Sequence, residues 1–185
     1  AKAGLRKAVG FFRETVTVQG GYLWQYSADL AKREGEGKAI ATQAWVQPPG
    51  TPSVGEAFLE AYAATGDSYY LDAAKETAAA LVRGQLQSGG WDYKIEFDSE
   101  LRANYSYKVE GTTRRFNTST LDDNTTQSAL AFLIHVHNAL GKTDDAIGGA
   151  IFYALEKLLE AQYPNGAWPQ RFIAAPDPSK YPVMK

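Results

Sequence analysis

The sequence lacks several features that define well-known classes of site. It has no cysteine among its 185 residues, which excludes disulfides and thiolate metal ligands. It has no apolar run of about 18 residues, so we expect no membrane-spanning helix and no membrane partner. Phosphate-binding loops, serine nucleophile elbows and zinc signatures are also missing. A net charge of -2 argues against a general nucleic-acid partner. The length fits a single domain over residues 1–185.

Helices of two kinds alternate along the chain. Each of two pairs combines a helix that is apolar nearly all round with a helix that has one polar face, and a further helix precedes both pairs. The predicted ranges are 4–15 for the first helix, 54–64 and 125–140 for the apolar helices, and 68–87 and 144–162 for the amphipathic helices. Apolar inner helices that alternate with half-wet outer helices are what an α/α toroid requires.

We therefore predict an all-α fold, an incomplete α/α toroid of helical hairpins with a long loop or hairpin insertion at 92–121. Too few helices are present to close a ring, so we expect the chain to be the N-terminal part of a larger domain. Ser53, followed three residues later by Glu56, predicts a capping box at the start of the first apolar helix.

The two outer helices end in similar sequences. Residues 85–91 (QLQSGGW) and 162–168 (QYPNGAW) both place Gln and Trp six apart, and residues 19–24 look like a degenerate third copy. In antiparallel hairpins, the starts of inner helices and the ends of outer helices lie at the same end, so these turns should gather on one face. We expect the two tryptophans to fasten their helices, and Trp45 and Tyr93 to be the aromatic residues that contact a ligand.

Small polar and acidic residues crowd the start of the second inner helix. Residues 118–127 (TSTLDDNTTQ) include Asp122 and Asp123, directly before an apolar run. Two adjacent carboxylates could bind an oxygen-preferring cation such as Ca²⁺. Alternatively, one carboxylate caps the helix and the other is solvated. The spacing alone does not separate these two readings.

A basic excess lies close by in the sequence. Residues 102–121 carry Arg102, Lys108, Arg114 and Arg115 against the single acid Glu110. Such a cluster could hold a polyanion. An ordinary solvated surface is the reading that the local sequence favours.

Two motifs resemble the family-10 polysaccharide lyases, the pectic acid lyases. They are Gln162–Gln170 (QYPNGAWPQ) and Thr120–Thr126 (TLDDNTT) before an apolar helix. The similarity also includes Gly20–Trp24 (GGYLW) and Val46–Gly55 (VQPPGTPSVG), and is closest to uncharacterised bacterial homologues.

The resemblance implies an α/α toroid and Ca²⁺-dependent β-elimination of polygalacturonate. It also implies that Asp122 matches the family's calcium-side aspartate, whereas Asp123 stands where the family commonly has asparagine. The family's base is an arginine in the C-terminal half, beyond this chain, so no catalytic residue is assigned. A secreted or periplasmic location follows from the resemblance, although the chain shows no signal peptide.

These observations define the candidate site residues. Asp122 and Asp123 are the candidate metal ligands. The candidate substrate-binding residues are Trp45, Tyr93, Arg114, Arg115, Asp123 and Asn124. The expected cofactor is Ca²⁺, and the expected partner is an acidic polysaccharide bound by a monomer.

Two other functions compete with a lyase. A toroid that binds an acidic glycan without cleaving it is favoured by the departure at Asp123. A terpenoid cyclase, which also uses an α/α toroid, is a weaker alternative. Such enzymes need acidic motifs with more carboxylates than Asp122–Asp123 provides.

Overall fold

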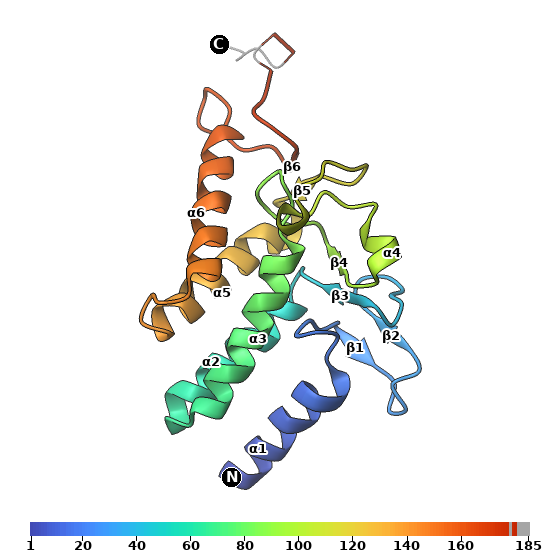
Figure 1. Cartoon of the computed structure of the whole chain (residues 1–185), viewed down its shortest axis with the longest axis vertical. Helices are drawn as coiled ribbons and strands as arrows, with labels where there is room; N and C mark the ends of the chain where they lie inside the picture. Colours follow the sequence, from blue (N-terminus) through green and yellow to red (C-terminus); the bar gives the residue numbers. More distant parts are fainter. Residues whose placement is uncertain (178, 181–185) are drawn as a thin grey trace.

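Helical hairpins set the shape of the molecule (Figure 1). The computed structural model describes residues 1–177 and 179–180. A first helix, α1, runs into a π-helical turn and is followed by the hairpins α2–α3 and α5–α6. The bounds are α1 Lys2–Phe11, the π turn Phe12–Val16, α2 Thr51–Thr65, α3 Ser68–Gly84, α5 Thr125–Ala139 and α6 Asp145–Glu160. All five predicted helices are confirmed, to within about one turn at each end.

In the part of the chain that the structure describes, three small antiparallel sheets join the segments between the helices. Each has two strands, and they pair β1 with β2, β3 with β4, and β5 with β6. The bounds are β1 Gln25–Tyr26, β2 Arg33–Glu34, β3 Gln43–Trp45, β4 Lys94–Glu96, β5 Ser119–Thr120 and β6 Arg171–Phe172. In Figure 1 the strands lie at one end of the hairpins, and the α2–α3 and α5–α6 turns lie at the other. The predicted gathering of inner-helix starts and outer-helix ends on one face is therefore confirmed.

The predicted insertion at 92–121 has structure of its own. It contains β4, the short helix α4 (Ser99–Arg102), a 3₁₀ turn at Lys108–Glu110, and β5. The strands β4 and β5 attach its two ends to different partners, β3 and β6. The insertion thus links the two hairpins at the end where the strands gather.

The core is densest along α3, which packs against α2, α5 and α6. Its inward residues are small, with Ala73, Ala74 and Ala78 almost completely buried, so the neighbouring helices can approach closely. At the end of α3, a Cβ on Gly84 would lie 2.2 Å from the side chain of Ile95. Alanine content here serves close packing as well as helix propensity.

The inner helices are less buried than predicted. Their sequences, apolar nearly all round, predict burial on most sides. Each nevertheless leaves one face exposed, including Ala57 and Glu60 on α2 and Ala131 and His135 on α5. The physical reason is that alanine counts as apolar in the sequence pattern, whereas its small side chain costs little free energy when it is exposed to water. No segment of the described chain covers this face.

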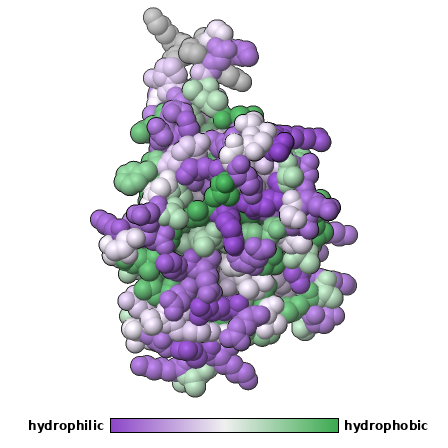
Figure 2. All heavy atoms as spheres, in the orientation of Figure 1, coloured by the Kyte–Doolittle hydropathy of each residue, from purple (hydrophilic) through white to green (hydrophobic). Residues whose placement is uncertain are grey.

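The surface of the helices is mainly polar in the view of Figure 2, with scattered apolar side chains. The largest apolar exposure on α6 comes from Phe152 and Leu159, which are 75% and 69% exposed. Among the residues that the structure describes, no helix is both long and apolar enough to cross a membrane.

The predicted capping box at Ser53 and Glu56 is wrong. Helix α2 begins at Thr51, and its N-cap, Gly50, makes no side-chain capping bond. Glu56 instead faces His135 on α5, with its Oε1 atom 2.7 Å from Nδ1. The pattern failed because the helix starts two residues before the box.

Both tryptophans fasten the ends of their outer helices, as predicted. The indole Nε1 of Trp91 donates to the carbonyl of Leu81, and that of Trp168 donates to the carbonyl of Leu158, both at 2.8 Å. In each case the acceptor lies ten residues earlier, in the last turns of the helix. The glutamines of the two motifs also match, because Gln85 and Gln162 each donate to the carbonyl four residues ahead.

The predicted third copy of this turn, at residues 19–24, is also present, and Tyr22 takes the place of the tryptophan. The Thr51 hydroxyl accepts from the backbone N–H of Tyr22 and donates to its carbonyl. In the same way, the Thr126 hydroxyl accepts from the N–H of Trp91 and donates to its carbonyl. A threonine at the start of each inner helix therefore fixes the end of the preceding outer segment.

Candidate functional site

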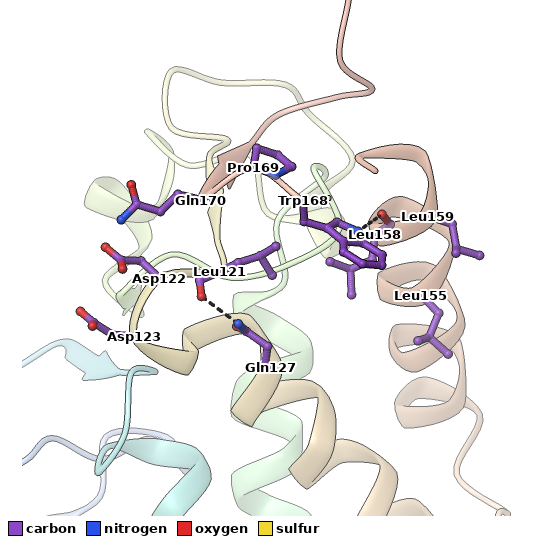
Figure 3. A pocket seen from close by; sticks show the side chains of 10 residues that line it. All are labelled: Leu121, Asp122, Asp123, Gln127, Leu155, Leu158, Leu159, Trp168, Pro169 and Gln170. Carbon is purple, nitrogen blue, oxygen red and sulfur yellow. Dashed lines mark hydrogen bonds between the residues drawn. The ribbon is translucent and has the colours of Figure 1, made fainter. Parts of the chain in front are cut away.

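The acidic residues lie in a sharp bend between β5 and α5. Asp123 and Asn124 both have positive φ angles, 48° and 60°, which side chains other than glycine rarely adopt. Asp and Asn tolerate this region best, at a cost of about 1–3 kcal/mol for each residue. The bend is held by the Thr120 hydroxyl, which accepts from the N–H of Asp122 at 3.1 Å. It brings the carboxylates of Asp122 and Asp123 to the same side of the chain, as Figure 3 shows.

Asp122 is surrounded by polar and cationic groups. The Tyr93 hydroxyl donates to its Oδ2 atom at 2.9 Å. Hydrogen bonding by Gln170, then by Tyr93, and the nearby charge of Arg171 lower the pKa of Asp122. Arg171 in turn lies 5.5 Å from the centre of the Tyr93 ring. This carboxylate is therefore held in its ionised form next to a cationic side chain.

Asp123 is held from the opposite direction by Gln47. The Nε2 atom of Gln47 donates to Oδ2 of Asp123 at 3.0 Å, and its Oε1 atom accepts from the indole of Trp45 at 2.9 Å. Gln47 and Trp45 are both buried, at 5% and 4% exposure. The side chain of Gln47 is thus fixed at both ends, and the position of the Asp123 carboxylate follows from it.

The aspartate pair suits a hard cation, but only as part of a shared site. Ca²⁺ takes six to eight oxygen ligands, and two carboxylates supply only some of them. Among the residues that the structure describes, no group of three or more His, Cys, Asp or Glu side chains could hold a metal ion. The donors are all oxygen, and each hydrogen bond described above uses one oxygen of its carboxylate. The remaining ligands must come from water, from a substrate, or from elsewhere.

A large hollow of about 840 Å³ lies between the bend and α6, and Asp122, Asp123 and Gln170 are among the residues that line it. Its walls are mainly apolar, from Leu155 and Leu159 on α6 and from Trp168. Figure 3 shows that the side chains of Asp122 and Asp123 point away from these leucines. The hollow therefore has a polar end at the aspartate pair and Gln170 and an apolar end at α6 and Trp168.

The structure brings four of the predicted site residues together. Tyr93 is hydrogen-bonded to Asp122. Trp45 is linked to Asp123 through Gln47, so that the two sets of hydrogen bonds meet at the bend. Asn124 is exposed at the start of α5 and makes no side-chain capping bond. Its role in substrate binding stays a prediction.

Arg114 and Arg115 lie on the exposed part of the insertion. The guanidinium of Arg115 lies 5.1 Å from the ring centre of Phe116, and the backbone of Arg114 bonds the hydroxyl of Ser106. None of these contacts involves the aspartate pair. Their predicted role as substrate-binding residues is not tested by this arrangement.

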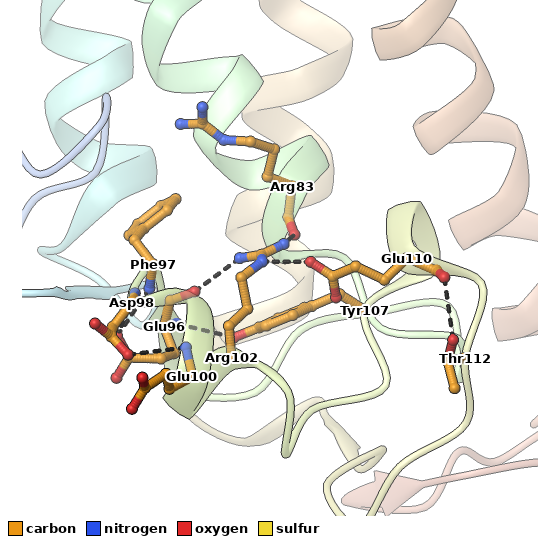
Figure 4. Close-up of polar contacts among 9 residues, drawn as sticks. All are labelled: Arg83, Glu96, Phe97, Asp98, Glu100, Arg102, Tyr107, Glu110 and Thr112. Carbon is orange, nitrogen blue, oxygen red and sulfur yellow. Dashed lines mark hydrogen bonds and ion pairs between the residues drawn. The ribbon is translucent and has the colours of Figure 1, made fainter.

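The basic excess of residues 102–121 is partly structural. Arg102 donates to the carbonyl of Glu96 at 2.7 Å, to the carbonyl of Arg83 and to the carboxylate of Glu110, and it lies 4.0 Å over the ring of Tyr107 (Figure 4). This guanidinium ties α4 of the insertion to α3, and also to β4. Arg102 therefore has a structural role, and its contacts give no support to the alternative in which this basic cluster binds a polyanion.

Sequence reasoning missed Gln47, Gln170 and Arg171. Gln170 and Arg171 follow shortly after Trp168. The repeat of the Gln-to-Trp turn at 85–91 and 162–168 could have indicated Arg171. A shift of 77 residues that superposes Trp91 on Trp168 also superposes Lys94 on Arg171, and these residues begin the strands β4 and β6. Gln47 had no comparable signal.

A comparison of the sequence with known families identifies the chain. The sequence profile of the pectic acid lyases matches residues 85–183, more than half of the chain. The chain belongs to the pectic acid lyase family. The segment that matches this family contains Tyr93, the aspartate pair and Arg171, whereas Trp45 and Gln47 precede it. A search of curated proteins finds no match.

Solved structures confirm the α/α toroid. A family 10 polysaccharide lyase from Cellvibrio cellulosa matches with a TM-score of 0.58 and 21% identity, covering 91% of this chain and 50% of the other. A mutant family 10 polysaccharide lyase from Cellvibrio cellulosa in complex with trigalacturonic acid matches with a TM-score of 0.53 and 19% identity, covering 92% and 56%. This pectic acid lyase family member thus spans about half the length of the structures it matches.

Proposed function

We propose that this chain forms the cation-binding side of a lyase site that cleaves polygalacturonate or a related uronate polysaccharide. One observation carries the proposal. The strained bend presents two adjacent carboxylates, Asp122 and Asp123, to the same side, with Arg171 close to Asp122. The trigalacturonic acid in the related solved structure supports an acidic glycan as the ligand.

In β-elimination, a base removes the proton at C5 of a uronate, its electrons form the C4–C5 double bond, and the C4–O4 bond breaks. Negative charge develops on the uronate carboxyl group during proton removal, and groups that neutralise this charge accelerate the step. A bound Ca²⁺ would supply such neutralisation. Arg171 is placed to add a guanidinium contact to a carboxylate, for which its planar donors are well suited.

The surrounding residues prepare the aspartate pair for this role. Tyr93 orients Asp122 and Gln47 orients Asp123, each through a single hydrogen bond to one carboxylate oxygen. The lowered pKa of Asp122 keeps this ligand ionised in mildly acidic solution. We propose that both aspartates hold Ca²⁺, with substrate carboxylates and water completing its coordination.

The described residues carry no base that we can assign. We therefore propose that the described residues contribute cation and substrate binding to the reaction. A glycan-binding toroid without lyase activity is the second candidate, favoured by the carboxylate of Asp123 where the family commonly has asparagine. Release of 4,5-unsaturated uronate, followed by its ultraviolet absorbance, would identify the lyase. We also propose a secreted or periplasmic location, because the polymeric substrate is too large to cross a membrane.

Calcium titration of variants tests the proposed metal site. Isothermal calorimetry in the presence of trigalacturonate should show that Asp122→Asn weakens calcium binding at least tenfold, or about 1.4 kcal/mol. Asp72→Asn, on the exposed side of α3, is the matched control and should bind as the parent does. Equal calcium affinity of Asp122→Asn and the parent would show that the aspartate pair is no metal site.

A further inference from the structure

A second cavity, of about 480 Å³, opens beside the aspartate pair. This volume falls within the range of about 300–1,000 Å³ that is usual for small-ligand sites. Its walls combine three aromatic rings with three charged side chains. The residues that line it include Glu36, Trp45, Asp92, Tyr93, Lys94 and Tyr105. Aromatic rings mixed with hydrogen-bonding groups are suited to a sugar, which has apolar faces and a polar edge.

Two of these wall residues are connected to the aspartates by hydrogen bonds, one directly and one through Gln47. Tyr93 is one of the residues that line the cavity, and its hydroxyl group donates a hydrogen bond to Asp122. Trp45 lines the cavity and is linked through Gln47 to Asp123. A saccharide unit in this cavity would therefore be close to a unit held at the aspartate pair. The cavity has the place of a neighbouring subsite on the same polymer.

The aromatic wall at Trp45 is held by close contacts with Gly35 and Lys94. Gly35 allows the chain to cross the ring of Trp45 so closely that a Cβ there would lie 2.0 Å from Cδ2. On β4, the ammonium of Lys94 lies 5.0 Å from the centre of the same ring and donates to the carbonyl of Lys38 at 3.3 Å.

Asp92 gives the cavity its chemical preference. It is half-buried, and its Oδ1 atom accepts from the backbone N–H of Tyr93 at 2.8 Å. Burial raises the pKa of Asp92, whereas the nearby positive charges of Arg171 and Lys94 offset part of this effect. A carboxylate kept in such surroundings is well placed to accept a hydrogen bond from a ligand hydroxyl.

The charges of the cavity disfavour a second uronate. Among the side chains that line the cavity, Asp92 and Glu36 are negative and only Lys94 is positive, while Arg171 lies near Asp92 without lining the cavity. With water-like screening, like charges about 6 Å apart repel by an amount that corresponds to about threefold in affinity. An uncharged sugar meets no such repulsion and keeps the hydroxyl groups that Asp92 can bind.

We propose that this cavity is a subsite for an uncharged pyranose unit, such as a methyl-esterified galacturonate, next to the uronate held at the aspartate pair. The preferred polymer is then partly esterified or carries neutral sugars. The inference rests on the proposed function, because the aspartate pair must hold the neighbouring uronate.

Calorimetry with two defined probes tests the subsite. Trigalacturonate and singly methyl-esterified trigalacturonate are each titrated into the chain in the presence of Ca²⁺. The esterified probe should bind at least about threefold more tightly. In Asp92→Asn this preference should fall towards one, because the unesterified probe gains affinity. Glu100→Gln, which removes an exposed carboxylate on α4, should leave the preference unchanged.

The outcomes separate this inference from the function on which it rests. Calcium-dependent binding of trigalacturonate that equals or exceeds binding of the ester would overturn the subsite and leave the proposed function standing. A preference that survives in Asp92→Asn would overturn it as well. If neither probe binds, the proposed function fails and the subsite fails with it.

Discussion

Gln47 offers a sharp test of how the aspartate pair is positioned. Its amide donates to Asp123 at 3.0 Å and accepts from the Trp45 indole at 2.9 Å, and its backbone carbonyl accepts from the Trp24 indole at 2.8 Å. Gln47→Leu removes both side-chain bonds but leaves the backbone bond in place. The change therefore acts on the Asp123 carboxylate without removing either of the two proposed metal ligands.

Two magnitudes follow from these contacts. The buried indole N–H of Trp45 is left without an acceptor, which lowers the free energy of unfolding by about 1–3 kcal/mol. The Asp123 carboxylate loses the donor that orients it. Loss of such an outer hydrogen-bond partner typically weakens metal binding about 10–100-fold. Calcium affinity should therefore fall by more than the loss of stability alone would suggest.

Calorimetric titration with calcium and trigalacturonate, paired with urea unfolding, measures both effects. Gln43→Leu is the matched control, because this half-buried glutamine on β3 bonds Glu96 at 3.1 Å and has no contact with the aspartates. Gln47→Glu keeps an acceptor for Trp45 but gives Asp123 no donor at neutral pH, so it should lose calcium affinity while keeping more stability. Unchanged calcium affinity in folded Gln47→Leu and Gln47→Glu would refute the positioning role.

Three further predictions concern stability and ionisation. Thr126→Val leaves the buried N–H of Trp91 without its acceptor and should lower the unfolding free energy by about 1–3 kcal/mol in urea, whereas Thr126→Ser should cost only about 1 kcal/mol. Burial raises the pKa of Asp92, so the folded protein binds that proton more tightly and loses stability as the pH rises through this pKa. Asp92→Asn should therefore raise the Tm at pH 7 and change it little below about pH 4. Tyr93→Phe removes a donor to ionised Asp122 and should raise the pKa of Asp122 in an NMR titration.

The helices could be predicted because their signal is local. The apolar period and the flanking turn residues placed all five long helices, and the repeat of Gln and Trp identified the matching turns. The start of α2 was misplaced because Thr51 serves the tertiary contact with Tyr22, which no local capping rule describes. The strands β3 to β6 could not be predicted. Each has only two or three residues, too few to show an alternation of apolar and polar side chains, and each pairs with a strand far away in the sequence.

The site was only partly readable for the same reason. Asp122 and Asp123 stood out as surplus acid at one helix start, and Trp45 and Tyr93 as aromatic residues near that face. Gln47 lies 76 residues from Asp123 along the chain, and only the folded structure brings the two together. An isolated glutamine carries no chemical signature in a sequence, so its role was not visible there.

The measurement that tests the central claim most directly is the affinity of this chain for trigalacturonate, by calorimetry, once with calcium and once with a chelator. The account predicts binding in calcium that is lost in chelator and is weakened at least tenfold, or about 1.4 kcal/mol, by Asp122→Asn. Binding that is equally strong in chelator and in Asp122→Asn, or no binding in calcium at all, would contradict it.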